Sequence, residues 1–162
     1  MPHDEQHPDR IVVGVDGSEQ AGRALRWALR QAELTGAAVE AVIAWEPPYT
    51  GWGGDVPAGE KKELGILADK VLAENVAKVL GAGPHVEVRA RAAEGTPAQV
   101  LLSAAADGDV ALLVVGSRGI GGFAGALLGS VGQHCAQHAP CPVVIVRGRD
   151  TSGPESEDTV PH

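Results

Sequence analysis

The glycines of the segment Val114–His134 have a spacing that suits phosphate binding. Gly116, Gly119 and the pair Gly129-Ser130 form the pattern G-x2-G-x9-G-S, which follows an apolar run and precedes a short helical stretch. Glycine lets backbone N–H groups approach a phosphate closely, and the start of a helix offers unpaired amides and the positive end of its dipole. The pattern therefore predicts a nucleotide site.

A second group of candidate residues follows the first apolar run, where Gly14, Val15 and Asp16 form a turn. Asp16 can accept hydrogen bonds from ribose hydroxyls, or it can serve only as a turn or cap residue. Arg118 can neutralise phosphate charge, and its alternative is an exposed loop arginine without a partner. Ser130 offers both its hydroxyl and its backbone N–H to a phosphate, because it starts a helix.

Other chemistry is weakly supported by the residues. No glycine is followed by the GK[ST] of a P-loop, and Gly119–Ala124 matches the dinucleotide fingerprint only loosely, with no acidic residue about twenty positions on. His134 and His138 have the i, i+4 spacing of metal ligands, but two histidines leave a zinc site short, and Cys135 between them belongs to an apolar stripe. We therefore assign no metal site and no catalytic residue, and we favour binding of a nucleotide over its cleavage.

The elements that position these residues alternate along the chain as βαβαβαβαβ. Strands that alternate with helices, most of them uniformly apolar, predict one α/β domain, an open five-stranded parallel sheet with helices on both faces. Strands one and four should flank the point where the strand order reverses, which is where such sheets bind ligands. The strands are expected at Arg10–Val15, Ala38–Trp45, Val86–Ala92, Val110–Val115 and Val143–Val146. The helices are expected between Ser18 and Gly36, over Glu60–Leu80, from Thr96 onward, and over Ser130–His138.

Composition narrows the classes of partner. The chain of 162 residues has 13 Lys plus Arg against 21 Asp plus Glu, a net charge of -8, which argues against binding to nucleic acid or to an anionic membrane through a basic surface. No apolar run has the length of a membrane span, and the first residues lack the apolar core of a secretion signal. We expect a cytoplasmic protein whose two cysteines are reduced.

The two ends of the chain and one internal segment lack apolar periodicity. Residues 1–9 and the acidic residues 148–162 are expected to be disordered tails around a single domain over residues 10–147. The turn-rich segment 46–59 is expected to be a long loop that can act as a flap over the site.

Three matches resemble the universal stress protein family, in its ATP-binding subgroup. They are GVDGS after the first strand, the complete glycine pattern, and the terminal strand CPVVIVR, and together they span Arg10–Arg147. The resemblance implies a Rossmann-like sheet of the adenine nucleotide alpha hydrolase type. It also implies that Asp16 lies near the ribose, that Ala44 lies against the adenine, and that the glycine pattern surrounds ribose and phosphates. The expected binding residues are Gly14, Asp16, Ala44, Gly116, Ser117, Arg118, Gly119, Gly121, Gly122, Gly129, Ser130 and Val131.

The function that follows is an ATP-binding regulatory domain of the stress response, with Mg²⁺ on the phosphates. The resemblance also implies a homodimer through the last strand, and the apolar edge Val143–Val146 gives a physical reason for pairing. Two alternatives stay open. One is slow hydrolysis of ATP or use of ATP to activate a substrate, although GVDGS replaces the SGGxDS loop of ATP pyrophosphatases. The other is a flavodoxin-like flavin carrier.

Overall fold

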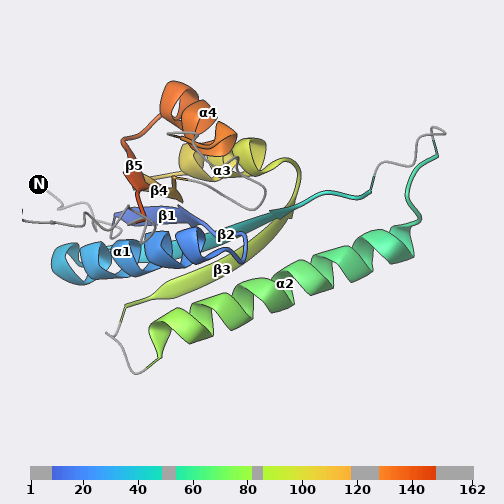
Figure 1. Ribbon diagram of the computed structural model, residues 1–162, viewed down its shortest axis with the longest axis horizontal. Coiled ribbons are helices and arrows are strands. Elements are labelled where there is room, and N and C mark those ends of the chain that lie inside the picture. Colours follow the sequence, from blue (N-terminus) through green and yellow to red (C-terminus); the bar gives the residue numbers. More distant parts are fainter. Residues whose placement is uncertain (1–8, 49–53, 82–85, 118–127, 149–162) are drawn as a thin grey trace, which may run out of the picture.

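The chain forms a twisted sheet with helices on both of its faces (Figure 1). The computed structural model describes residues 9–48, 54–81, 86–117 and 128–148. In chain order the elements are β1 (Arg10–Gly14), α1 (Glu19–Thr35), β2 (Ala38–Trp45), α2 (Ala58–Leu80), β3 (Val88–Glu94), α3 (Pro97–Ala106), β4 (Val110–Gly116), α4 (Ser130–His138) and β5 (Val143–Val146). The predicted alternation of strands and helices is confirmed.

The five strands lie in the order β3-β2-β1-β4-β5, and every neighbouring pair is parallel. Strand β1 lies in the middle of the sheet, β2 and β3 extend the sheet on one side of it, and β4 and β5 extend it on the other. The strand order therefore reverses between β1 and β4, as predicted. In the central strand, Ile11, Val12 and Val13 are each at most 1% exposed, which explains why its sequence is apolar on both faces.

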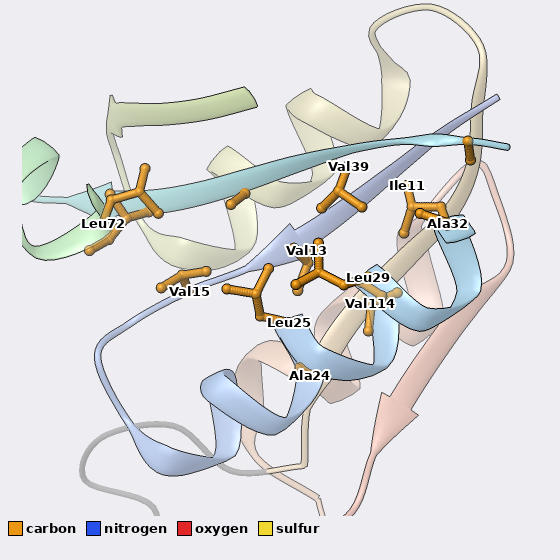
Figure 2. Close-up of a cluster of buried hydrophobic side chains, with 14 of the residues drawn as sticks. Ile11, Val13, Val15, Ala24, Leu25, Leu29, Ala32, Val39, Leu72 and Val114 are labelled. Atoms are coloured by element: carbon orange, nitrogen blue, oxygen red, sulfur yellow. The ribbon is translucent and has the colours of Figure 1, made fainter. Parts of the chain in front are cut away.

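Each face of the sheet has its own apolar core, because successive side chains of a strand point to opposite faces. On one face, Ile11 and Val13 pack with α1 and α2 through side chains such as Leu25 and Leu72 (Figure 2). On the other face, Val12 packs with residues of α3 and α4, and this core includes Cys135. Helices α1 and α2 thus cover one face, and α3 and α4 cover the other.

Three predicted helix ends, at Ser18, Gly36 and Thr96, are confirmed by cap geometry. The Ser18 side chain accepts a hydrogen bond from the Ala21 N–H at 3.2 Å, which satisfies a donor of the first turn of α1. Gly36 ends α1 with a φ of 77°, a left-handed backbone that glycine adopts without strain. Thr96 caps α3 in the same way as Ser18 caps α1, with Pro97 in the first turn.

Three predicted boundaries are wrong by two residues. Helix α2 begins at Ala58 rather than Glu60, because the Lys61 N–H bonds to the Pro57 carbonyl at 3.1 Å and closes a first turn that needs no large apolar side chain. Strand β3 runs over Val88–Glu94 rather than residues 86–92, because its pairing with β2 sets its limits at both ends. Smaller differences are that β1 ends one residue earlier than predicted, and β4 extends one residue further.

Several predictions concern residues outside the described part of the chain. These are the tails, apart from Asp9 and Gly148, and the middle of the 46–59 loop, residues 49–53. Within the described residues, no helix combines the length and apolar character needed to cross a bilayer.

Candidate functional site

A cleft of about 230 Å³ opens beyond the carboxyl ends of β1 and β4. This is the point of strand-order reversal at which open α/β sheets place their ligands. Its wall is largely apolar, and Asp16 is the only ionisable side chain among the described residues that line it. The lining residues are Gly14, Val15, Asp16, Ala21, Val42, Ala44, Pro97, Leu101, Val115, Gly116 and Val131.

Five of the residues predicted from the sequence meet in this cleft: Gly14, Asp16, Ala44, Gly116 and Val131. They come from the ends of β1, β2 and β4 and from the first turn of α4, so the fold brings together segments that are far apart in the chain. Four other predicted residues, Arg118, Gly119, Gly121 and Gly122, lie outside the described residues.

Ser117, Gly129 and Ser130 lie at the base of the glycine-rich segment. The Ser117 N–H donates to the Val146 carbonyl of β5 at 3.0 Å, and the Ser117 carbonyl accepts from the Gly129 N–H at 2.7 Å. Ser130 follows as the first residue of α4 and precedes Val131, which lines the cleft. The backbone of these residues thus ties β4, β5 and the start of α4 together beside the cleft.

The carboxylate of Asp16 organises the turn between β1 and α1. Its Oδ1 accepts hydrogen bonds from the backbone N–H of Ser18, at 2.9 Å, and from the Ser18 hydroxyl. Gly17 between them has a φ of 84°, which only glycine adopts readily. The turn role that the sequence left open for Asp16 is therefore present, and it holds the same carboxylate at the cleft wall.

Two glycines of the cleft wall have different reasons to lack a side chain. A Cβ on Gly14 would lie 3.0 Å from Cδ1 of Leu101, so glycine leaves space at the cleft wall. A Cβ on Gly116 would lie 3.1 Å from the carbonyl carbon and oxygen of Gln20, in the first turn of α1. Gly116 therefore lets β4 and α1 pack closely, a structural role that its place in the phosphate-binding pattern does not reveal.

Sequence reasoning missed several apolar residues of the cleft. Val115 ends a predicted strand, Val42 lies in the second half of another, and Pro97 and Leu101 are one helical turn apart at the start of α3. Their signal in the sequence is that of ordinary core residues, and only the topology directs them to one place. Together they give the cleft an apolar wall that also includes one carboxylate, an arrangement that suits a flat aromatic ring joined to a group with hydroxyls.

Within the part of the chain that the structure describes, His134 and His138 of α4 belong to no cluster of possible metal ligands. The rings of His134 and His138 lie 4.6 Å apart, and Cys135 between them is 0% exposed in the core. Burial raises the pKa of the Cys135 thiol, and the nearby Cys141 raises it further. Among the residues that the structure describes, no group of three or more His, Cys, Asp or Glu side chains could hold a metal ion.

Comparison with known proteins gives a consistent result. The model of the universal stress protein family matches residues 8–147 of the chain. A universal stress protein of Mycobacterium tuberculosis is 37% identical over 149 residues, which cover 91% of this chain and 47% of that protein. The chain thus spans about half the length of this relative.

Solved structures that resemble the chain include nucleotide complexes. A universal stress protein in complex with cAMP is 30% identical, with a TM-score of 0.66, and the match covers 85% of this chain and 96% of the other. A universal stress protein from Archaeoglobus fulgidus in complex with dAMP is 26% identical, with a TM-score of 0.53 and the same coverage of both chains.

Proposed function

The chain belongs to the universal stress protein family, and we propose that it binds ATP, with Mg²⁺, in the cleft between β1 and β4. The observation that carries the proposal is the meeting of five predicted binding residues in one cleft at the strand-order reversal. The cAMP and dAMP complexes of similar proteins support an adenine nucleotide as the class of ligand.

Different parts of the cleft wall suit the adenine, the ribose and the first phosphates of the proposed ligand. The adenine lies in the apolar part of the cleft, against Ala44 and between Val42 and Leu101. The Asp16 carboxylate accepts hydrogen bonds from the ribose hydroxyls. The ribose and first phosphates lie along the end of β4 at Gly116 and Ser117.

The phosphates lie toward the start of α4, where the amides of Gly129 and Ser130 and the helix dipole favour negative charge. Arg118 and the glycines at 119, 121 and 122 are proposed to complete this contact. Because Asp16 is the one carboxylate among the described lining residues, the magnesium ion would be held mainly by phosphate oxygens and water. This is how Mg²⁺ usually binds when a nucleotide supplies its ligands.

The cleft is better suited to holding a nucleotide than to cleaving one. No lysine lines it within the described residues, and the one carboxylate there already accepts two hydrogen bonds from Ser18. We therefore propose a regulatory role in the stress response, in which the nucleotide-bound and nucleotide-free forms present different surfaces to a partner.

The same proposal includes a homodimer through β5. This strand ends the sheet, and its four residues, Val143–Val146, are all apolar and all partly exposed. An apolar edge strand with unpaired backbone groups favours pairing with a second copy. Sedimentation at micromolar concentration should show a dimer, and a monomer would contradict this part of the proposal.

Isothermal titration with ATP, ADP, AMP and cAMP, each with magnesium chloride, tests the binding site. Asp16→Asn keeps an oxygen for the Ser18 contacts but removes the charge, and we expect it to weaken ATP binding about tenfold, since hydrogen bonds to charged groups contribute about 1.5–3 kcal/mol. Asp69→Asn, at an exposed position on α2, is the matched control and should bind like the wild type.

A second nucleotide tests whether Asp16 contacts the ribose hydroxyls. The 2′,3′-dideoxy form of ATP lacks both ribose hydroxyls, so the loss caused by Asp16→Asn should nearly vanish with this ligand. An equal loss with ATP and with the dideoxy form would place Asp16 elsewhere than at the ribose. Absence of binding by all four natural nucleotides would refute the proposed function.

A further inference from the structure

A second hollow, which we call the α1–α2 groove, lies outside the cleft. It has a volume of about 260 Å³ and runs between the start of α1 and the C-terminal half of α2, which lie on the same face of the sheet (Figure 1). Its wall is polar, unlike that of the cleft. The lining residues are Gly17, Ser18, Glu19, Gly22, Arg23, Arg26, Asn75, Lys78 and Val79.

The groove concentrates positive charge in an acidic chain. Arg23, Arg26 and Lys78 line it against a single carboxylate, that of Glu19, although the chain as a whole has a net charge of -8. Elsewhere in the described chain, Arg10 and Arg91 pair with Glu40, Arg89 with Glu87, and Lys61 with Glu94, whereas Arg30, Lys62, Lys70 and Arg147 have no such pair. None of the three groove cations has such a pair among the described residues.

The groove cations are carried on two packed helices, so their spacing is fixed by the fold. Arg23 and Arg26 are three residues apart on α1 and therefore share a face, and Lys78 faces them from the last turn of α2. The guanidinium of Arg23 lies against Gly148, just after β5, so Arg26 and Lys78 are the two cations on which binding in the groove rests. The side-chain amide of Asn75 donates to the Val71 carbonyl of its own helix at 2.8 Å. Asn75 therefore lines the groove, and we do not count it among the groups that bind the anion.

We propose that the α1–α2 groove binds a small anion of the phosphate class that carries at least two negative charges. The Arg26 guanidinium matches the oxygens of a phosphate through paired N–H donors, and Lys78 adds a point charge. The start of α1 contributes the positive end of a helix dipole on the same side. The Ser18 hydroxyl is already used by Ala21 and Asp16, so recognition rests on Arg26 and Lys78.

The groove and the cleft meet at one turn of the chain. Asp16 lines the cleft, whereas Gly17 and Ser18 line the groove. The phosphate can therefore come from two sources. One is a free anion such as pyrophosphate. The other rests on the proposed function: it is the phosphate chain of the nucleotide in the cleft, extending past Gly17 instead of toward α4. The chemistry of recognition is the same for both, and the experiment separates them.

Titration of the ¹⁵N-labelled full chain with sodium pyrophosphate at low ionic strength tests the site. We expect amide shifts at Gly22 and Val79, and an affinity that falls as sodium chloride is added, because exposed charges are screened. Arg26→Gln and Lys78→Gln should each weaken binding about three- to tenfold. Arg30→Gln, one turn further along α1 and outside the lining set, should bind like the wild type.

The position of the shifts decides the outcome. Groove shifts with pyrophosphate that persist when ATP is already saturating support a site for a free anion. Groove shifts with ATP but not with adenosine support the phosphate chain of a nucleotide as the source. Pyrophosphate shifts confined to Gly129 and Ser130, or equal affinities for wild type, Arg26→Gln and Lys78→Gln, would overturn the proposal.

Discussion

Gly116 lies where the end of β4 packs against the first turn of α1, and its replacement by alanine should destabilise the fold. The new Cβ would lie 3.1 Å from the backbone carbonyl carbon and oxygen of Gln20 and 3.2 Å from its Cβ. These are mainly backbone atoms, so the contact cannot be relieved by a rotamer change. Overpacking of this kind lowers the free energy of unfolding by about 1–3 kcal/mol. Alanine also makes the unfolded chain less flexible than glycine does, which offsets about 0.4–1 kcal/mol of this loss. We expect a net loss of about 1–2 kcal/mol.

Urea unfolding followed by circular dichroism measures this loss. With a slope of about 2 kcal/mol per molar urea, the midpoint of Gly116→Ala should fall by about 0.5–1 M while the slope stays unchanged. Gly22→Ala is the matched control, because a Cβ there meets no atom within 4 Å and Gly22 lies inside α1. Alanine favours helix over glycine by up to about 1 kcal/mol, so the control midpoint should rise.

The opposite midpoint shifts expected for Gly116→Ala and Gly22→Ala test the packing argument separately from nucleotide binding. If Gly116→Ala unfolds at the wild-type midpoint, the close approach of β4 and α1 does not constrain this position, and the reasoning fails. If the midpoint falls as expected, ATP affinity measured well below the transition then reports how far the same glycine also serves the proposed ligand. A fall in the Gly22→Ala midpoint would show that glycine substitutions cannot be interpreted from Cβ contacts in this fold.

Three further predictions concern the core, a helix cap and a thiol. Leu72→Ala should lower the free energy of unfolding by about 2–5 kcal/mol in urea titrations, since Leu72 is 0% exposed, whereas Leu67→Ala, at 56% exposure, should change it by less than about 0.5 kcal/mol. Thr96→Ala should cost about 1 kcal/mol through loss of the α3 cap, and Thr96→Ser should restore most of it. Burial raises the pKa of Cys135 above its usual value of 9.0, so the unfolded thiol loses its proton first. The urea midpoint should therefore stay level below about pH 8 and fall as the pH rises past 9, with a smaller fall in Cys135→Ala.

The parallel fold could be predicted from the sequence because its signals are local. The apolar run of β1, the caps Ser18 and Thr96, and the terminating Gly36 each specify one element without help from the rest. The start of β3 could not be predicted in this way, since the limits of an edge strand follow from its pairing with β2. The first turn of α2 was missed because it carries no large apolar side chain.

The site could be predicted only in part, for a related reason. Gly14, Asp16 and Gly116 were found because turn residues after a buried strand are unusual enough to be noticed. Leu101 and Val42 were missed as cleft-lining residues because an apolar side chain that lines a cleft and one that fills a core look alike in a sequence. The contact between Gly116 and Gln20 joins residues almost a hundred positions apart, so no local pattern could reveal it.

The hydrogen bonds of Ser117 fasten both ends of the glycine-rich segment to the rest of the domain. Because Ser117 bonds to Val146 and to Gly129, the sheet and α4 are joined at the base of the segment. The cost of closing a loop changes by only about 0.6 kcal/mol for each doubling of its length. The entropic cost of closing the segment between these two ends is therefore nearly the same over a range of lengths. In the proposed function, the contacts of this segment with the nucleotide can change while the sheet that carries it stays the same.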